Sequence, residues 1–344
     1  MLPVFDGHLD SLQKMYLAEN PQSLLNVTAG HFDIPRAVRG GFAGGLFSIF
    51  VPPPKKWEPD RSRFPAPDDE RFNPVEHDYA QLVASRGISA LHCLADTSSG
   101  SFRIILKGTD IEENMNRGAI SAVMHFEGAE PIRADLANLE EFYASGLRSV
   151  GLVWCRNNAF GCGVRFRFPG SPDDGPGLTA AGEALVKRCN RMGILVDLSH
   201  LNEKGFWHVA RVSNAPLVAT HSCMHTVTPA SRNLTDRQLD AVKTSGGLVG
   251  INFCTGFIRG DGRLTPDTPL SDLVRHFRHA ADRMGIDHVA FGSDFDGAVI
   301  PERIGDVAGL PRVVEALMQS GFSESEVRRM AYANWIRVLS DTLV

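Results

Sequence analysis

The sequence contains no run of about 20 uncharged apolar residues, the length that a membrane-spanning helix needs. Its first residues, MLPVFDGHLD, lack the basic segment and the apolar segment of a secretory signal. Positive charge is not in excess, because 35 Lys and Arg stand against 40 Asp and Glu, for a formal net charge of -5. These absences predict a cytoplasmic protein without a membrane partner and argue against nucleic acid as a partner.

Cysteine is scarce, with six residues in 344 and no Cys-x-x-Cys pair. This number is too low for a disulfide framework in a chain of this length, so we expect free thiols, mostly in the core. Cys155 and Cys162 lie in a Gly-rich stretch and are the two thiols for which we expect exposure. Internal repeats, low-complexity tails and a clear linker are also lacking, which predicts a single domain over residues 1–344. The alternative is two doubly wound halves joined near Pro172–Gly177.

Short apolar runs rich in β-branched residues alternate with segments of helical periodicity from one end of the chain to the other. This alternation is typical of a parallel α/β architecture. Eight strands with helical crossovers favour a closed (β/α)₈ TIM barrel over an open sheet. The predicted strands are Leu2–Asp6, Gly44–Val51, Ala119–Phe126, Leu147–Trp154, Ile194–Leu198, Leu217–Thr220, Gly247–Phe253 and His288–Gly292.

Helices are predicted between these strands, most of them after Ser, Thr, Asp or Asn caps. Pro52–Pro74 is rich in proline and charge and predicts a long loop after the second strand, followed by a largely helical region over Pro74–Arg117. Ser323–Leu339 predicts an amphipathic C-terminal helix. The other predicted helices are Asp135–Ser145, Thr179–Met192, Asn202–Ser213, Thr235–Thr244, Pro269–Met284 and Leu310–Ser320.

Catalytic residues in such a barrel come from the C-terminal ends of the strands. The first strand leads into His8 and Asp10, a His-x-Asp pair whose side chains share one side of an extended chain and can bind one cation. The third predicted strand ends at Glu127, a carboxylate able to bridge two cations. Each signal alone fits an ordinary polar loop residue equally well.

Three further strands also end in residues that can bind or serve a metal ion. The fifth and sixth predicted strands lead to His200 and His221, and the eighth leads to Asp294. Neutral imidazoles combined with carboxylates suit Zn²⁺ or a similar ion. Five strand ends of this kind predict one binuclear metal site with His8, Asp10, Glu127, His200 and His221 as ligands. Two close cations activate a water and polarise a carbonyl, and Asp294 is the predicted proton shuttle.

The remaining histidines are interpreted as structural. His125 is expected to point away from Glu127 and its neighbours, and His225 to lie in a loop. His276 and His279 are flanked by arginines on a helix, which predicts a solvated face. No partnered pattern surrounds the other five, which are His31, His77, His92, His208 and His288.

Taken together and in order, the motifs resemble those of the renal (membrane) dipeptidases, binuclear zinc peptidases on a (β/α)₈ barrel. The resemblance spans nearly the whole chain and implies that His8 and Asp10 bind one zinc ion, that His200 and His221 bind the other, and that Glu127 bridges them. The motifs are Asp6-Gly7-His8-Leu9-Asp10, Glu127-Gly128, Asp197-Leu198-Ser199-His200, His221-Ser222, Ser231-Arg232-Asn233 and Gly292-Ser293-Asp294-Phe295-Asp296-Gly297.

The same resemblance implies the substrate, a dipeptide whose C-terminal residue often has the D configuration. Arg232 and Asn233 are implied to bind the substrate, and Arg232 to pair with its terminal carboxylate, a role that suits its planar fork of donors. Relatives of this kind also suggest a homodimer. The competing interpretations are another amidohydrolase-like enzyme, such as a deaminase or cyclic-amide hydrolase, and a barrel that binds without turnover. Amidohydrolase-like barrels commonly open with His-x-His, whereas this chain has His8-x-Asp10.

One position departs from the family pattern. Where well-known members have a histidine that contacts the substrate oxyanion, this sequence has Trp154, which can donate one hydrogen bond but cannot carry positive charge. The zinc ions alone, or nearby Arg156 or Asn157, would then supply that role. The loop that follows also contains Arg165 and Arg167, so one of its three arginines is a candidate to recognise an acidic side chain, with a solvated loop as the alternative.

Overall fold

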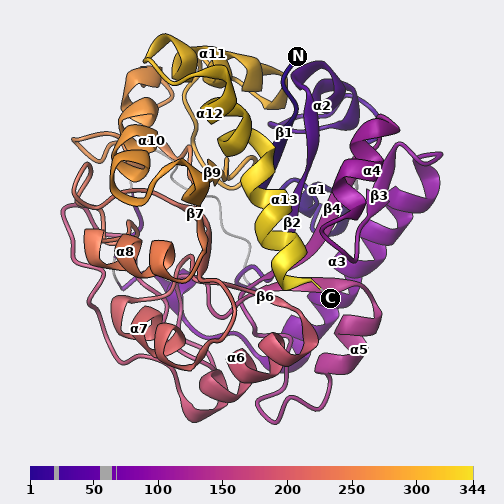
Figure 1. Cartoon of the computed structure of the whole chain (residues 1–344). Coiled ribbons are helices and arrows are strands. Elements are labelled where there is room, and N and C mark those ends of the chain that lie inside the picture. Colours follow the sequence, from indigo (N-terminus) through magenta and orange to yellow (C-terminus); the bar gives the residue numbers. More distant parts are fainter. Residues whose placement is uncertain (19–22, 55–63, 67, 344) are drawn as a thin grey trace.

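Eight parallel strands close into a barrel in the computed structural model, which describes residues 1–18, 23–54, 64–66 and 68–343. The circle runs β2, β1, β9, β8, β7, β6, β5, β4, and β2 pairs with β4 to close it. Helices surround the strands, as Figure 1 shows. The strands are β1 (Val4–Leu9), β2 (Phe42–Phe50), β4 (Ile120–Glu127), β5 (Leu147–Gly151), β6 (Leu195–Asp197), β7 (Val218–Ser222), β8 (Leu248–Ile251) and β9 (Val289–Phe291).

The predicted barrel and its eight strands are confirmed. Barrel strands are buried on both faces and therefore read as continuous apolar runs, and all eight residues of β4 are buried. The first strand extends to Leu9, so that His8 is a strand residue. The fourth predicted strand ends at Gly151, because the side chain of Asn158 binds the carbonyl of Leu152 (2.9 Å) and the chain turns there. Trp154 consequently belongs to the loop after β5.

The structure has helices where they were predicted, with boundaries shifted by a few residues, and it adds three short ones that were not predicted, Gln13–Tyr16, Ile34–Gly40 and Thr255–Ile258. Thr179 and Asn202 cap α6 and α7 as expected, and Thr235 forms a capping box at α8. The helices are α1 (Gln13–Tyr16), α2 (Ile34–Gly40), α3 (His77–Thr97), α4 (Asp110–Asn116), α5 (Leu139–Ala144), α6 (Ala180–Met192), α7 (Glu203–Val212), α8 (Asp236–Thr244), α9 (Thr255–Ile258), α10 (Leu270–Met284), α11 (Leu310–Gln319), α12 (Glu324–Arg328) and α13 (Asn334–Thr342).

One strand was missed. The region predicted to be largely helical contains α3 and α4, but also β3 (Phe102–Ile104), which pairs with the first residues of β4. β5 pairs with β4 further along, from Met124 onward, so β3 is an addition beside the barrel and not one of its eight strands. Three residues are too few to display a period of two, which explains the miss.

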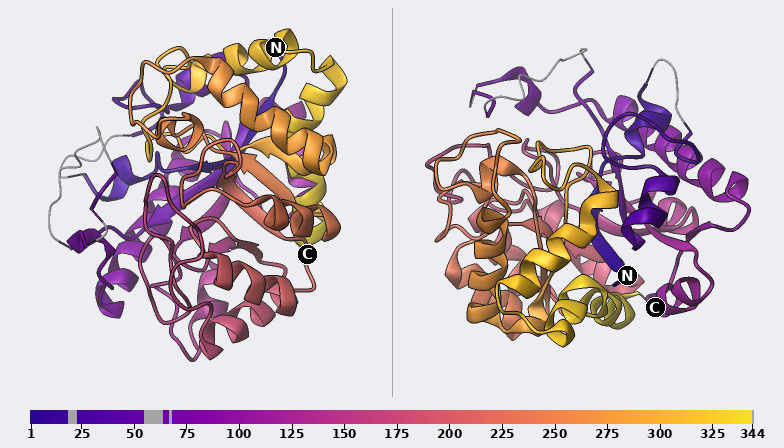
Figure 2. Two further views of the ribbon diagram at one scale, coloured as in Figure 1. Left: turned by 90° about the vertical axis from the view of Figure 1, so that its left-hand side faces the viewer. Right: turned by 90° about the horizontal axis from the view of Figure 1, so that it is seen from above.

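The C-terminal segment packs against β1, β8 and β9. It consists of α12, a π-helical turn at Arg329–Ala333, and α13, where one continuous helix was predicted. Trp335 of α13 is fully buried and donates its indole N–H to the carbonyl of Phe291 in β9 (2.9 Å). Both termini lie on one side of the molecule (Figure 2). The parallel pairing of β1 with β9 brings the first and the last strand of the chain side by side.

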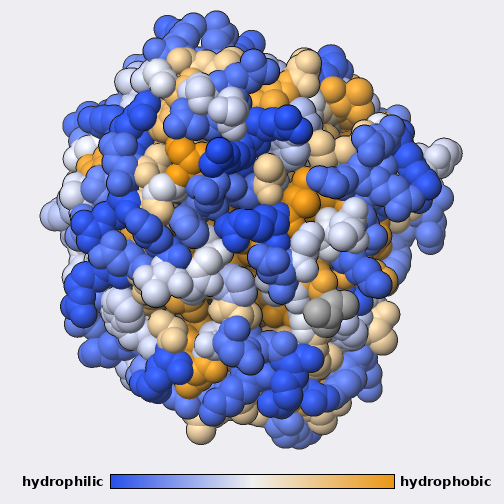
Figure 3. Space-filling model, viewed as in Figure 1, coloured by the Kyte–Doolittle hydropathy of each residue, from blue (hydrophilic) through white to orange (hydrophobic). Residues whose placement is uncertain are grey.

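On the face seen in Figures 1 and 3, the surface is mainly hydrophilic, with small separate hydrophobic areas (Figure 3). None of the helices in the described part of the chain is both long enough and apolar enough to cross a membrane.

Candidate metal centre

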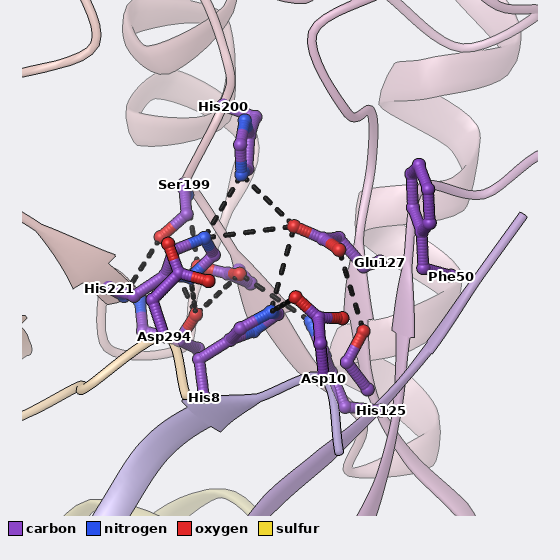
Figure 4. Close-up of polar contacts among 12 residues, drawn as sticks. His8, Asp10, Phe50, His125, Glu127, Ser199, His200, His221 and Asp294 are labelled. Carbon is purple, nitrogen blue, oxygen red and sulfur yellow. Dashed lines mark hydrogen bonds and ion pairs between the residues drawn. The ribbon is translucent and has the colours of Figure 1, made fainter. Parts of the chain in front are cut away.

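Glu127, the last residue of β4, faces three imidazole rings from three other strand ends (Figure 4). Its Oε1 lies 3.0 Å from Nε2 of His200, 3.6 Å from Nε2 of His8 and 3.7 Å from Nε2 of His221. His8 is on β1, His221 is on β7, and His200 follows β6. The structure therefore brings together four of the five predicted ligands around one carboxylate oxygen.

Asp10, the fifth predicted ligand, also lies beside His8. Its Oδ2 is 3.7 Å from His8 Nε2, and one ligand atom each of His8, Asp10 and Asp294 lie within 4.8 Å of one another. His8 forms two further such groups, one with Glu127 and His221 and one with His125 and Asp197. His8 is thus shared by all three sets of donors.

The donor set fits a divalent cation such as Zn²⁺. Both ring nitrogens of His8 are buried and have no hydrogen-bond partner, although buried polar atoms in proteins are nearly always paired. The other donors are also buried imidazole nitrogens and carboxylate oxygens, the ligand types that zinc takes in proteins. The residues that hold such an ion would be His8, Asp10, Glu127, His200 and His221.

The charges of this cluster favour a cation. Burial raises the pKa of Glu127 well above its usual range, because a carboxylate is poorly solvated there. Burial would lower the pKa of His8, but the carboxylates of Glu127, Asp10 and Asp294 outweigh burial and raise it to about 10. Several carboxylates buried this close together are stable in the charged form only when positive charge lies nearby.

The two other histidines remain neutral. Burial lowers the pKa of both His200 and His221 well below the usual value, and the positive charge of Arg232 acts in the same direction. A neutral imidazole retains the nitrogen lone pair that binds a metal.

Two further acids, Asp6 and Asp197, hold the strand ends in register. Asp197 accepts hydrogen bonds from the backbone N–H of Ser199 (2.9 Å) and of Thr220 (2.8 Å), the residues directly before His200 and His221. Asp6 accepts from the backbone N–H of Ser293 (2.6 Å), directly before Asp294. Both acids belong to the sequence motifs, but the sequence alone indicated no role for them. Ligand-bearing loops are thereby tied across neighbouring strands.

The backbone is strained at the site itself. His200, Asp294 and Asp296 have φ values of 66°, 63° and 69°, in the left-handed region that residues with side chains seldom adopt. Such strain is found where a surrounding network holds a functional side chain in place.

Comparison with known proteins agrees with this geometry. The family model for membrane dipeptidases, peptidase family M19, matches residues 1–343. The chain belongs to the membrane dipeptidase family. A metallopeptidase from Rhodobacter sphaeroides, solved with a phosphinate mimic of the dipeptide L-Ala-D-Ala, is 45% identical, with a TM-score of 0.95 over 99% of both chains. The structure of dipeptidase AC is also 45% identical, with a TM-score of 0.92 over 99% of both chains. An uncharacterised protein in the pqqA 5′ region of Klebsiella pneumoniae is 47% identical over 254 residues, 74% of this chain and 94% of that protein.

The position of His125 in this membrane dipeptidase family member differs from the prediction. It was expected to point away from the site, but its ring lies 5.3 Å from the ring of His8, centroid to centroid. Its Nε2 is 3.7 Å from Oδ2 of Asp197. His125 and Glu127 are two residues apart on β4, so their side chains share the barrel interior, and this spacing was the signal available in the sequence.

Three other expectations were wrong. His276 is not on a solvated face: it is fully buried, and its Nδ1 accepts from the backbone N–H of Met224 (3.0 Å). His279, by contrast, is partly exposed and pairs with Asp236. Cys155 and Cys162 are buried, because the loop after β5 folds inward, and the sulfur of Cys155 lies 2.8 Å from Nδ1 of His200.

A cleft of about 360 Å³ opens beside the metal centre. Its lining includes Asp10, Glu127, His200 and Asp294 together with Trp154, which was predicted to contact substrate. The size and the mixture of apolar walls with a few polar groups are typical of a site for a small ligand.

The other three predicted substrate residues lie behind the cleft wall. Arg232 is 3% exposed, and its guanidinium donates to Nδ1 of His200 (3.1 Å), to Oγ of Ser222 (2.8 Å) and to the carbonyl of His221 (2.9 Å). Asn233 is buried and donates to the carbonyls of Thr228 and Phe257 (2.8 and 2.9 Å). Arg156 is also buried, in an ion pair with Glu130 (2.8 Å). Of the three, only Arg232 reaches the metal-binding residues directly.

Proposed function

We propose that the site binds two Zn²⁺ ions and hydrolyses the single peptide bond of a dipeptide. The position of one Glu127 oxygen within 3.0–3.7 Å of the imidazoles of His8, His200 and His221, in a member of the membrane dipeptidase family, is the observation that carries this proposal. In this assignment His8 and Asp10 hold one ion, His200 and His221 hold the other, and Glu127 bridges them. Bound ions of this kind supply Lewis acidity, which activates a water and polarises the peptide carbonyl.

The side chains of the cleft would bind the substrate and move its protons. Asp294 lies on the cleft wall, and burial raises the pKa of its carboxyl above its usual range, which favours proton uptake by this group. Asn252 donates to its Oδ2 (2.9 Å) and orients it. Arg232 is the proposed partner of the C-terminal carboxylate; because its guanidinium lies behind the cleft wall and donates to His200, Ser222 and His221, one of these hydrogen bonds would have to be exchanged for the carboxylate.

We extend the proposal to the configuration of the substrate. The 45% identical Rhodobacter sphaeroides metallopeptidase was solved with a phosphinate mimic of L-Ala-D-Ala. We infer that this protein also accepts a D-residue at the C-terminal position. A homodimer and a cytoplasmic location stay predictions from the sequence.

Metal analysis and a dipeptide screen test the proposal. Protein purified without chelator should contain about two Zn per chain, as expected for five N and O ligands with one bridging carboxylate. It should hydrolyse dipeptides in a mixed L,L and L,D panel and lose this activity after chelation. Two zinc ions with deamination or lactone hydrolysis in place of dipeptide cleavage would favour the amidohydrolase alternative. Absence of bound metal after zinc reconstitution would favour a non-catalytic barrel.

A further inference from the structure

One wall of the cleft is a continuous cluster of aromatic rings. The rings of Phe50 and Trp154 are 5.0 Å apart, those of Trp154 and Phe166 are 6.0 Å apart, and those of Phe166 and Phe257 are 5.7 Å apart. Phe64 stacks on Phe257 at 5.4 Å with an interplanar angle of 14°. All five rings line the cleft, and we call them the aromatic wall.

The aromatic wall adjoins the reacting centre. The ring of Trp154 is 6.2 Å from the ring of His200, and Phe166 is 6.1 Å from it. Phe50 is the register partner of Glu127 on the neighbouring strand and stands beside it in Figure 4. A dipeptide with its peptide bond at the metal ligands therefore has at least one side chain against these rings.

A buried ion pair supports the wall from behind. The guanidinium of Arg156 lies 5.4 Å from the ring centroid of Phe50 and 5.5 Å from that of Trp154. It donates to Glu130 Oε1 (2.8 Å) and to the carbonyl of Val51 (2.5 Å). Val51, Glu130 and Trp154 follow three different strands, β2, β4 and β5. One arginine thus joins three loops and fixes the two rings in front of it.

The cationic side chains near the cleft are already paired with carboxylates. Of the four carboxylates that line it, Asp296 pairs with Lys14 Nζ (2.8 Å), and Asp10, Glu127 and Asp294 lie in the proposed zinc site, where bound ions would offset their charge. The arginine among the described lining residues, Arg71, makes two 2.7 Å contacts with both oxygens of Asp69.

The loop arginines likewise contact other groups. Arg167 pairs with Asp174 (3.3 Å), and the guanidinium of Arg165 lies 6.0 Å from the ring of Phe72. Arg156 is neutralised by Glu130 behind the wall.

We propose that the aromatic wall is a specificity pocket for an apolar side chain of the dipeptide, in which Trp154 contacts that side chain and the Arg156–Glu130 pair holds the wall in position. The proposal rests on the proposed dipeptidase function, and it replaces the expectation that a loop arginine selects acidic dipeptides. Apolar contact in such a pocket is worth about 10- to 200-fold in kcat/KM for each methylene that fits.

The test uses the zinc-loaded full chain and two matched dipeptide series, Xaa-D-Ala and Ala-D-Xaa, with Xaa as Ala, Leu, Phe, Asp, Glu or Lys. In at least one series, Leu and Phe should exceed Asp and Glu by about 10-fold or more in kcat/KM. Trp154→Ala should lower kcat/KM for the Leu and Phe substrates by at least about 10-fold more than for Ala-D-Ala, so that most of that advantage is lost. Arg167→Ala, on the same loop, is the matched control and should leave the selectivity of the wild type intact.

Binding separates this proposal from the activity itself. Phosphinate analogues of the Leu, Phe, Asp and Glu dipeptides, measured by calorimetry, report on the pocket whether or not turnover occurs. Tighter binding of the Leu and Phe analogues with no hydrolysis of any dipeptide would contradict the proposed activity and support the pocket. Equal or tighter binding of the acidic analogues would overturn the pocket, and hydrolysis of Asp and Glu substrates at least as fast as Leu substrates would do the same.

Arg156→Lys tests the supporting role, because lysine keeps the charge opposite Glu130 but loses the planar fork. The ratio of kcat/KM for Leu and Ala substrates should fall by about threefold or more, with zinc content unchanged. An unchanged ratio in folded, zinc-loaded Arg156→Lys protein would show that the pair does not position the wall.

Discussion

Glu127 occupies the position on which the binuclear assignment depends. Its Oε1 faces three imidazole nitrogens, and its Oε2 lies 3.5 Å from the hydroxyl of Ser48. In Glu127→Gln, one oxygen becomes an N–H donor, which cannot bind a cation and loses the negative charge. We expect zinc to fall from about two per chain to less than one by elemental analysis, since one bridging ligand serves both ions. Glu141→Gln, an exposed position on α5, is the control. Full zinc content in Glu127→Gln would contradict the bridge.

Asp294 is assigned to proton transfer, although it also lies close enough to His8 and Asp10 to be a ligand. Asp294→Asn keeps the shape and removes the proton-accepting oxygen. We expect kcat to fall by roughly 10²- to 10⁴-fold, as for loss of a general acid–base group, with zinc content unchanged. A parallel loss of zinc would instead identify Asp294 as a ligand.

Arg232 has two possible tasks, which kinetics can separate. It is the proposed partner of the substrate carboxylate, and it also donates to residues around His200 and His221. If it binds the carboxylate, Arg232→Ala should raise KM for free dipeptides by about 10-fold or more, the usual effect of losing a charge-assisted hydrogen bond. C-terminally amidated dipeptides should be affected much less. An equal loss for both substrates would mean that Arg232 only supports the metal ligands.

At the scale of elements, the buried side chain of His276 connects α10 to the loops that follow the barrel strands. Burial lowers the pKa of His276 to about 3, because the protonated ring would be poorly solvated in the core, and the carbonyl of Ile258, 3.2 Å from Nε2, opposes this shift only in part. An unfolded histidine titrates near 6.5. The stability that this group contributes is therefore complete above pH 6.5 and is lost as the pH falls from about 6.5 toward 3.

This gives a testable pH dependence. Between pH 6 and 4 the free energy of unfolding should fall more steeply in the wild type than in His276→Gln, which offers polar atoms but does not titrate in this range. The difference should approach about 1.4 kcal/mol per pH unit, the value for one proton. Denaturant unfolding at a series of pH values measures it, and identical slopes would show that His276 is not buried neutral.

Strands and helices of ordinary length could be predicted from the local sequence pattern, whereas very short or irregular elements could not. The strands of the barrel have apolar runs long enough to identify, and caps such as Thr179 and Asn202 mark helix starts within one residue. β3 was too short to show a period, and the π-helical turn before α13 carries no local signal. The burial of His276 was missed because its arginine neighbours dominate the local pattern, although Leu273, Phe277 and Ala280 lie on the same buried face of α10.

For the whole molecule, metal binding should add to the stability of the fold. The proposed ligands come from β1, β4 and β7 and from the loop after β6, so a bound ion joins distant parts of the barrel. An ion that binds only the folded state at about 1,000 times its Kd adds about 4 kcal/mol. Chelation should therefore lower Tm by on the order of 10 °C, and stoichiometric zinc should restore it. Equal Tm values for metal-free and zinc-loaded protein in calorimetry would argue against ions at these strand ends.

The sequence by itself determined the barrel, the order of its strands along the chain and the residues at their C-terminal ends. These features depend on local periodicity, and parallel strands place their C-terminal ends at one rim whatever the loops do. His8, Glu127 and His221 were identifiable for that reason. Only the tertiary structure decided how the loop after β5 folds: Trp154 lines the cleft, while Arg156 turns behind it toward Glu130 and Val51. Those partners lie 26 and 105 residues away in the chain, so no local pattern could indicate them.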